Sequence, residues 1–411
     1  MPTIPSKPAR LAAGVAILFA AGTMAYGGIF DFGERPLGSD ANKRMAEFLR
    51  LAAEQMGYET TNLPFKCVWW TSGPSFLDRE GAKVEVFAGP YSPAFDKRCD
   101  GIAVSSTGQL KRARCEGKIV FLRGEIAKEP LMPLDYPFYF PDAHKEIYAL
   151  LDERRPAAVV AVTGKHPANG MDPHPLFDDA AFRIPSAYMS AAAFDEMMKG
   201  SGKIRLKIDS KTVPETGEQV VARKRAAGAK GKIAIFAHMD SAYGTPGALD
   251  NAAGVAVLLR TMIQLKDYTG PYDLEFIPFN GEESPMAKGQ LAYLDAFGRE
   301  TGDIRLAINI DAVGAKDSKT AVSAYNMDDE RKRGLDAALA PYPRIERGPE
   351  WVEGDHSIFV FQGIPCVALT SSTLREGVMA VSHTPNDTVE GVDLGLLVET
   401  ADFIAALVKG L

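Results

Sequence analysis

Histidine and carboxylate side chains follow several apolar stretches of this chain, and their types suit metal-dependent chemistry. In order, they are His238, Asp240, Asp250, Glu282, Glu283, Asp311 and His383. Imidazole and carboxylate groups are common ligands of catalytic divalent metals, and a carboxylate is also a common general base. Each residue alone could be an ordinary loop side chain or a helix cap. The chemistry therefore depends on whether they meet in space.

The elements that carry these residues predict that they do meet. The apolar run Ile233–Ala237 is typical of a buried strand, and apolar residues at helical spacing over 252–265 predict a helix that starts at Asp250 or Asn251. Further strands are predicted at 272–279, 304–310 and 364–370. Side chains beyond the carboxyl ends of neighbouring parallel strands converge on one crevice.

Carboxylates that converge in one crevice repel each other unless cations neutralise them. Two divalent ions carry four positive charges, which balance the carboxylates of Asp250, Glu283 and Asp311 together with one hydroxide. Paired zinc ions are a known hydrolytic arrangement with such ligands. We expect Asp250 to bridge the two ions, with His238 and Asp311 on one and Glu283 and His383 on the other.

Two further residues receive catalytic roles from this assignment. Glu282 is adjacent to Glu283 but is not needed as a ligand, and we expect it to be the general base. Asp240 lies two residues after His238 and could hold the second ring nitrogen of that histidine, which would fix its tautomer.

Five short motifs resemble those of the dinuclear zinc exopeptidases, the family of bacterial leucyl aminopeptidase and glutamate carboxypeptidase. They are His238–Asp240, Asp250–Gly254, Gly281–Glu283, Asn309–Asp311 and His383–Thr388, and all five ligand positions and the base are present. The resemblance implies an α/β fold in which a mixed, mostly parallel sheet lies between helices. It also implies two Zn²⁺ per chain, with Co²⁺ or Mn²⁺ able to use the same ligands, and peptide substrates.

The segment Gly354–Phe359 is also similar to a late segment of this family. Within it, His356 is a candidate for binding the substrate carbonyl or the oxyanion, with packing as the alternative. Asp387 is interpreted as a residue that orders its loop. Extra residues at 285–288, relative to common family members, are expected to reshape only the rim of the pocket.

Four segments are expected along the chain. They are a signal peptide or membrane anchor at 1–28, the first part of the peptidase domain at 29–89, an insert at 90–210 and the catalytic domain at 211–411. The insert resembles a protease-associated domain in its segments Gly117–Gly124, Ala157–Val162 and Ile184–Ser190.

Composition is consistent with a globular, exported protein. The chain has 411 residues, of which 46% are apolar, and its net charge of −7 argues against nucleic acid as a partner. Lys7 and Arg10 precede an uncharged run at 11–30, so we expect export to the periplasm or the medium, with an uncleaved run as the only membrane anchor. Cys99 and Cys115 could pair.

The best functional prediction is a dinuclear zinc aminopeptidase. Glutamate carboxypeptidase-like or dipeptidase activity at the same two ions is one alternative, and a single-zinc acyltransferase is another. A receptor or scaffold of the same fold without metal is the third. The sequence predicts neither the preferred side chain nor the oligomeric state.

Overall fold

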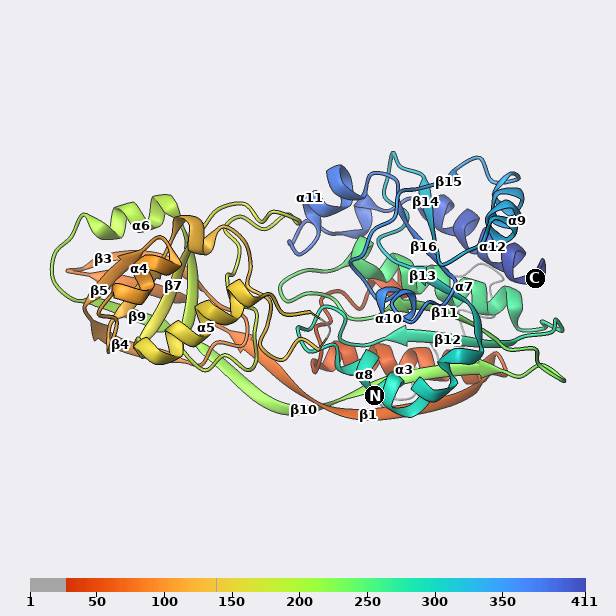
Figure 1. Cartoon of the computed structure of the whole chain (residues 1–411), viewed down its shortest axis with the longest axis horizontal. Helices are drawn as coiled ribbons and strands as arrows, with labels where there is room; N and C mark the ends of the chain where they lie inside the picture. Colours follow the sequence, from red (N-terminus) through yellow and green to blue (C-terminus); the bar gives the residue numbers. More distant parts are fainter. Residues whose placement is uncertain (1–26, 138) are drawn as a thin grey trace, which may run out of the picture. The chain divides into compact units, whose positions relative to one another are not determined.

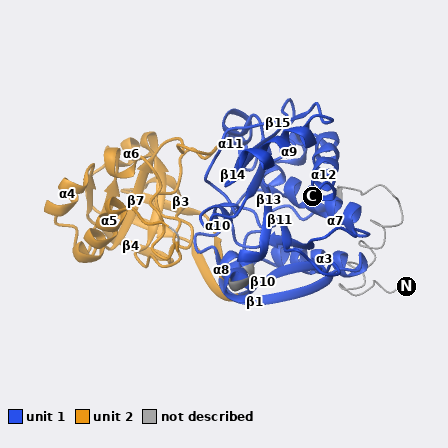
Figure 2. Cartoon of the chain, turned by 45° about the vertical axis from the view of Figure 1, so that its right-hand side comes forward, with its two compact units in different colours: residues 1–67, 216–411 blue, residues 68–215 orange. Residues whose placement is uncertain are grey.

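The computed structural model describes residues 27–137 and 139–411, drawn in colour in Figure 1. The expected signal peptide or anchor therefore lies almost entirely outside the described residues. Among the described residues, no helix is both long and apolar enough to cross a membrane. The chain forms two compact units, which Figure 2 colours separately. Unit 1 comprises the described residues up to Cys67 together with Thr216–Leu411, and unit 2 comprises Val68–Glu215.

Unit 1 is built on an eight-stranded mixed sheet with the order β1-β10-β12-β11-β13-β16-β14-β15. The strands are β1 (Glu59–Ser72), β10 (Ser210–Lys224), β11 (Lys232–His238), β12 (Asp273–Phe279), β13 (Ile304–Ile310), β14 (Thr320–Tyr325), β15 (Ile345–Arg347) and β16 (Cys366–Ser371). The central strands β12, β11, β13 and β16 are parallel, whereas β10 and β14 run antiparallel to their neighbours in this group. The expected mixed, mostly parallel sheet is confirmed.

Helices cover both faces of this sheet. They are α2 (Gly27–Phe30), α3 (Asp40–Gln55), α7 (Ala253–Leu265), α8 (Lys288–Phe297), α9 (Asp329–Leu339), α10 (Ser357–Val360), α11 (Met379–Val381) and α12 (Leu394–Lys409). Short irregular turns are η2 (Ala248–Ala252), η3 (Gly298–Asp303), η4 (Leu374–Val378) and η5 (Val389–Gly391). Of these helices, α7 packs against the central strands β11, β12 and β13.

The alternation of side chains along β11 explains why this strand is buried on both faces. Ile233 and Ile235 belong to the core formed with α3, α7 and α12, while Phe236 packs on the other face against Phe279 and Phe359. A strand covered on both faces is a nearly continuous apolar run. The central strands are therefore a rigid base for the residues that follow them.

Unit 2 contains a second eight-stranded sheet, with the order β4-β9-β2-β3-β8-β7-β6-β5. Its strands are β2 (Ser75–Arg79), β3 (Ala82–Ala88), β4 (Phe95–Cys99), β5 (Gly101–Val104), β6 (Ile119–Leu122), β7 (Ala158–Thr163), β8 (Ser186–Ser190) and β9 (Ile204–Ile208). Its helices are α4 (Thr107–Arg112), η1 (Gly124–Ala127), α5 (Asp142–Arg154) and α6 (Ala191–Met198).

The expected start of the insert differs from what unit 2 shows, and the cysteine pairing that the sequence left open is not formed. The boundary expected near residue 90 lies at Val68, because β2 pairs with β9 and β3 pairs with β8, so both strands belong to the second sheet. Cys99 and Cys115 are both free thiols. Cys115 is buried in the apolar core of unit 2, where burial raises the pKa of its thiol.

The first turn of α7 comes close to the end of β13, and Gly254 makes this approach possible. A Cβ atom at Gly254 would lie 2.6 Å from the carbonyl oxygen of Ile310 and 2.2 Å from Oδ1 of Asn251. Such contacts require the backbone to move. We therefore expect Gly254→Ala to lower the free energy of unfolding by about 1–3 kcal/mol or more, measured by denaturant unfolding.

Gly334, in the middle of α9, provides a matched control. It is also a helical glycine, but a Cβ atom there has no neighbour within 4 Å. Gly334→Ala should therefore stabilise the protein by about 0.5–1 kcal/mol, because alanine favours the helix and restricts the unfolded chain. Equal effects of the two substitutions would contradict the packing argument for Gly254.

Candidate metal centre

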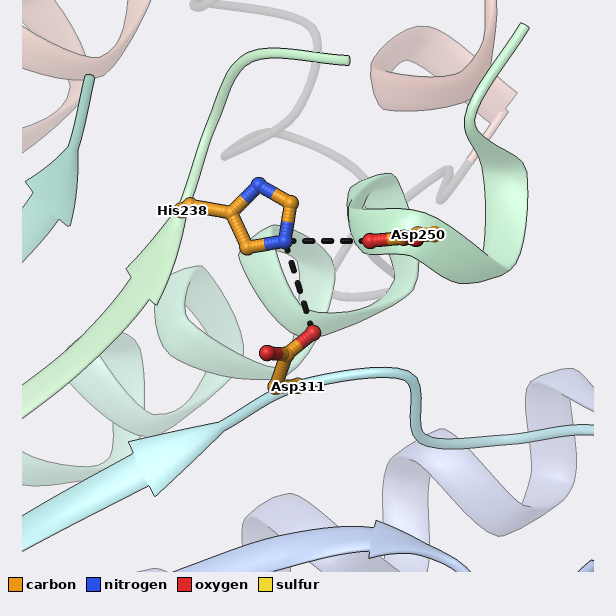
Figure 3. Close-up of side chains that lie close together, drawn as sticks. All are labelled: His238, Asp250 and Asp311. Atoms are coloured by element: carbon orange, nitrogen blue, oxygen red, sulfur yellow. Dashed lines mark ion pairs between the residues drawn. The ribbon is translucent and has the colours of Figure 1, made fainter. Parts of the chain in front are cut away.

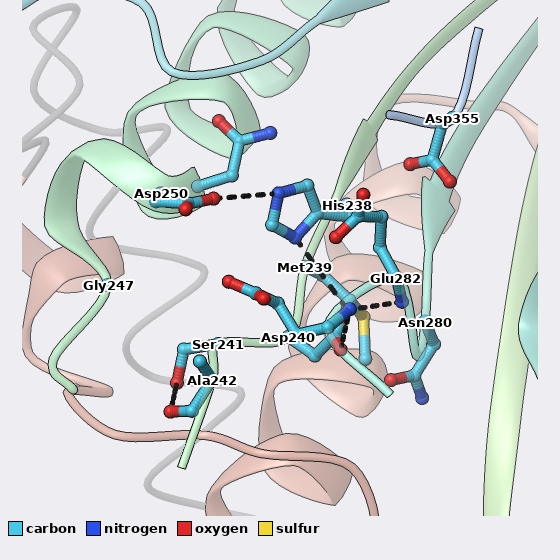
Figure 4. Close-up of polar contacts among 12 residues, drawn as sticks. His238, Met239, Asp240, Ser241, Ala242, Gly247, Asp250, Asn280, Glu282 and Asp355 are labelled. Atoms are coloured by element: carbon cyan, nitrogen blue, oxygen red, sulfur yellow. Dashed lines mark hydrogen bonds and ion pairs between the residues drawn. The ribbon is translucent and has the colours of Figure 1, made fainter. Parts of the chain in front are cut away.

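The candidate residues lie at one edge of the sheet of unit 1, beyond the carboxyl ends of its central parallel strands. His238 is the last residue of β11, Asp311 directly follows β13, and the pair 282–283 lies in the turn after β12. Asp250 lies in η2, just before α7, and His383 follows α11. Figure 4 shows His238, Asp250 and the turn after β12 around one space. The structure therefore brings together all five expected ligands.

These five residues form two groups that share one carboxylate. In the first group, Nε2 of His238 lies 3.1 Å from Oδ1 of Asp250 and 3.4 Å from Oδ1 of Asp311 (Figure 3). In the second group, Nε2 of His383 lies 3.0 Å from Oε2 of Glu283 and 3.5 Å from Oδ2 of Asp250. Within each group, the three candidate ligand atoms lie within 4.8 Å of one another. Asp250 thus offers one oxygen to each group.

The charges in this cluster call for cations. Burial alone would lower the pKa of both histidines, but the surrounding carboxylates raise both values well above the usual range. Conversely, hydrogen bonds from His238 and His383 outweigh burial at Asp250 and lower its pKa. Without metal, protons on the imidazoles therefore supply the positive charge that the carboxylates require.

The available donor atoms fit divalent metal ions. Each group combines one imidazole nitrogen with carboxylate oxygens and contains no thiolate, which is typical of catalytic zinc. Oε1 of Glu283 is buried without a hydrogen-bond partner, and a buried acceptor without a donor is costly unless it has another partner. A cation between Glu283 and its neighbours would satisfy this oxygen.

Asp240 is fully buried and holds the turn that carries the two glutamates. Its Oδ1 and Oδ2 accept the backbone N–H groups of Glu282 at 3.2 Å and Glu283 at 3.1 Å (Figure 4). Its Oδ1 also lies 3.8 Å from Nδ1 of His238, which is too long for a hydrogen bond. The contact of Asp240 with the glutamate turn was missed by sequence reasoning, because nothing in the sequence pairs residues this far apart.

Glu282 is half-buried beside His238 (Figure 4) and belongs to neither group of candidate ligands. Burial raises the pKa of its carboxyl well above the usual range, and the nearby charge of His238 only partly opposes this. Glu283 and Asp355 raise the pKa further. A carboxyl group with a raised pKa next to ligand groups can both accept and donate a proton.

Asp387 and Asn251 hold Asp250 in place. Oδ1 and Oδ2 of Asp387 accept the backbone N–H groups of Leu249 at 2.7 Å and Asp250 at 3.1 Å. Asn251 donates to the carbonyl oxygen of Ile310 at 2.9 Å, at the end of β13. These contacts agree with the interpretation of Asp387 as a loop-ordering residue, whereas the role of Asn251 was missed.

His356 is buried, and both of its ring nitrogens are engaged. Nε2 lies 2.9 Å from the carbonyl oxygen of Trp351, and Nδ1 lies 3.2 Å from Nδ2 of Asn309. The ring also packs edge-on against Trp351, and burial lowers its pKa. A direct contact with substrate would break these hydrogen bonds, so the structure favours the packing alternative over the substrate role.

Asp355 is a second buried carboxyl near the cluster that sequence reasoning did not assign. Its Oδ1 accepts a hydrogen bond from Nε2 of Gln290 at 2.7 Å, while its Oδ2 has no partner. The pKa of Asp355 is raised to about 7, chiefly by burial and also by the charge of Asp311, against the opposing effect of His238. Its position beside His356, in a segment that resembles the peptidase family, was the available signal.

The raised pKa of Asp355 predicts a pH-dependent stability of the metal-free protein. Protonated Asp355 favours the folded state at low pH, and this contribution is lost as the pH rises from about 4 through about 7. Asp355→Asn cannot ionise and keeps the acceptor for Gln290. Relative to the original protein, the variant should therefore gain about 2–3 kcal/mol between pH 5 and pH 8, measured by denaturant unfolding in chelator. An equal difference at both pH values would contradict this prediction.

The part of the chain that carries these residues matches a known protein family. Residues 219–408 match peptidase family M28. The chain is 25% identical to aminopeptidase YwaD of Bacillus subtilis over 203 residues, which cover 47% of this chain and 44% of that protein. It is 21% identical to leucine aminopeptidase 2 of Trichophyton equinum over 307 residues, which cover 71% and 58%. The chain thus spans about half the length of these relatives.

Two solved structures are similar over nearly the whole chain. One is BSAP, a zinc aminopeptidase from Bacillus subtilis, with a TM-score of 0.69 and 18% identity over 100% of this chain and 96% of that chain. The other is an aminopeptidase from Aneurinibacillus sp. strain AM-1, with a TM-score of 0.68 and 20% identity over 93% of both chains. At these identities the comparison establishes a shared fold.

Proposed function

Because the chain belongs to peptidase family M28 through residues 219–408, we propose that the protein is a metal-dependent exopeptidase that removes N-terminal residues from peptides. The relatives named above are aminopeptidases, and one of the similar structures is named as a zinc enzyme. We further propose that this chain holds two zinc ions. His238, Asp250 and Asp311 would hold one ion, and Asp250, Glu283 and His383 the other.

The observation that carries this proposal is the position of Asp250 between two histidines. Its Oδ1 is 3.1 Å from His238 and its Oδ2 is 3.5 Å from His383, so one carboxylate serves two ligand groups. The side chain of His238 in the first group is only 1% exposed, whereas that of His383 in the second group is 28% exposed. The second group is therefore more open to solvent, and a substrate can approach from its side.

The residues around the two groups support a hydrolytic mechanism. Bound zinc ions would polarise a peptide carbonyl and make water acidic enough to attack it at neutral pH. The carboxylate of Glu282 would accept the proton of the attacking water and then donate it to the nitrogen of the leaving amine. Asp240 would keep Glu282 aligned, because it holds the backbone N–H of that residue.

The ion pairs of Arg344 and Arg347 favour an aminopeptidase over a carboxypeptidase. A carboxypeptidase needs cationic side chains that are available to bind the terminal carboxylate of its substrate. The guanidinium of Arg344 instead pairs with Glu399 at 2.8 Å and Asp393 at 3.0 Å, and that of Arg347 lies 3.6 Å from Asp336. Both arginines precede the segment Gly354–Phe359 in the chain, and both have carboxylate partners.

Two further proposals concern the rest of the chain. Unit 2 is proposed to be a protease-associated domain, which the sequence motifs in β6, β7 and β8 support. Export is proposed because Lys7 and Arg10 precede the uncharged run at 11–30. N-terminal sequencing of the protein secreted by an expressing cell would test the second proposal, and an intact run at 11–30 would favour the anchor.

The roles of the adjacent glutamates predict opposite results for the same substitution. Glu282→Gln removes the proposed base and should lower kcat by about 10²–10⁴-fold while the metal content stays unchanged. Glu283→Gln removes a proposed ligand and should lower metal content and activity together. Metal analysis and kinetics on both variants test this. Loss of metal from the Glu282 variant alone would mean that the two roles are reversed.

Substrates that differ only at the amino terminus distinguish the proposed activity from its alternatives. We expect the purified zinc-loaded protein to hydrolyse aminoacyl p-nitroanilides with a free amine and not their N-acetylated forms. Cleavage of neither form by a protein with two zinc ions would favour a carboxypeptidase or dipeptidase. A protein that binds no zinc and cleaves neither form would favour the scaffold alternative.

A further inference from the structure

Arg35 is a fully buried arginine whose guanidinium, among the described residues, donates hydrogen bonds to backbone carbonyl groups alone. Nε donates to Met239 at 2.7 Å, Nη1 donates to Gly33 at 2.9 Å and Pro246 at 2.7 Å, and Nη2 donates to Gly247 at 2.9 Å. Three of the four acceptors belong to residues 239–247. Arg35 lies about 200 positions earlier in the chain, before α3 and before unit 2.

The loop 239–247 joins two of the proposed metal ligands. It begins immediately after His238 and ends one residue before η2, which contains Asp250. The loop contains no regular helix or strand, so its buried carbonyl groups need partners from elsewhere. Arg35 supplies them, and its own backbone N–H also donates to Oγ of Ser241 at 2.9 Å. The loop between His238 and Asp250 is therefore held at both of its ends by hydrogen bonds from one side chain.

The segment that contains Arg35 also holds the second ligand-bearing turn. Asn42, in the first turn of α3, exchanges two hydrogen bonds with Asn280, at 2.8 Å and 3.1 Å. Asn280 follows β12 and comes two residues before Glu282. Asn42 also donates to the carbonyl oxygen of Arg35 at 3.3 Å. One short N-terminal segment thus contacts two loops of the site, the loop 239–247 between His238 and Asp250 and the turn after β12 that carries Glu283.

The guanidinium charge lies close to carboxylates without pairing with any of them. Burial lowers the pKa of Arg35 to about 10, and the charges of Asp240, Asp387 and Asp250 oppose this decrease. The side chain is therefore protonated at neutral pH. Its planar fork directs several donors at fixed angles, whereas a lysine offers three donors from one point. Lysine would keep the charge but could not reach the same four carbonyl groups.

We propose that Arg35 is a positioning residue of the metal centre, which holds the loop 239–247 so that His238 and Asp250 face the same ion. This inference rests on the proposed function, because it requires the two ligand groups to bind metal. It also means that the metal centre is not complete within residues 219–408, the part of the chain that matches the peptidase family. The segment that precedes unit 2 is part of it.

The positioning role and a purely electrostatic role predict opposite changes in metal affinity. If Arg35 acted only through its charge, its removal would reduce repulsion of a cation and tighten metal binding. If it acts by holding the loop, its removal disorders the path between His238 and Asp250 and weakens binding. Residues that orient metal ligands typically affect affinity by about 10–100-fold.

The test is the dissociation constant for Zn²⁺, measured by competition with a chromophoric chelator. We expect Arg35→Lys and Arg35→Met each to raise this constant by at least about tenfold. Unchanged or tighter binding in either variant would overturn the inference. Absence of zinc binding in the unsubstituted protein would overturn the proposed function as well, so the two failures are distinguishable.

Arg223→Lys provides a matched control. Arg223 is another buried arginine of unit 1, but it pairs with Glu275 within β12 rather than with the ligand loops. Its substitution should lower the melting temperature of the metal-free protein and leave the dissociation constant for Zn²⁺ within about twofold. A tenfold loss of affinity in this variant would show that any buried substitution weakens the site, and would overturn the inference.

Ser241→Ala keeps the test possible if the Arg35 variants do not fold. It removes the acceptor for the backbone N–H of Arg35 and the hydroxyl donor to the carbonyl of Thr245 in the same loop, and leaves the guanidinium and both ligands unchanged. We expect a folded protein with a dissociation constant raised by about two- to tenfold, in line with the loss of the hydrogen bonds of one buried hydroxyl. An unchanged constant in this variant would contradict the role of the loop contact.

Discussion

Carboxylates are buried together at one edge of the sheet of unit 1, and the candidate metal centre depends on how their mutual repulsion is neutralised. The side chains of Asp250, Glu283 and Asp311 are each at most 12% exposed, and the imidazoles of His238 and His383 lie within 3.5 Å of them. Like charges in a space of low dielectric constant destabilise each other unless positive charge lies between them. The raised pKa values of His238 and His383 express this requirement without metal, and two cations would meet it with metal.

Several segments that carry the proposed ligands are held by groups from other parts of the chain. Asp240, which follows β11, fixes the turn after β12, and Asp387, near the C-terminus, fixes η2. Asn251 connects η2 to the end of β13. Because these contacts connect the loops to one another, displacement of one loop disturbs the ligands on another. A centre built in this way is expected to tolerate little change in any one connection.

Unit 2 interrupts the sequence of unit 1 and separates the N-terminal segment from the ligand loops along the chain. Val68–Glu215 form a separate unit with its own sheet and core. The residues before unit 2 nevertheless belong to unit 1, where Arg35 and Asn42 contact the ligand loops. An insertion at this place in the chain leaves the metal centre dependent on both flanking segments.

The sequence by itself determined the local elements and the residue types at their ends. Apolar runs and helical spacing predicted β11, β12, β13 and α7, because the spacing of apolar side chains along the chain indicates which faces of an element are buried. The same local pattern placed His238, Asp311 and the adjacent glutamates at strand ends, and the structure brings them together. The fold class was predictable for this reason.

Only the tertiary structure decided which distant polar groups meet. Three of the carbonyl groups that bind Arg35, the backbone N–H groups that bind Asp240 and the amide that binds Asp355 all lie far away in the sequence. The start of unit 2 at Val68 likewise depends on the pairing of β2 with β9. A polar residue or a short strand has the same local pattern whichever partner it finds, because hydrogen bonds and sheet pairing are satisfied in space and not along the chain.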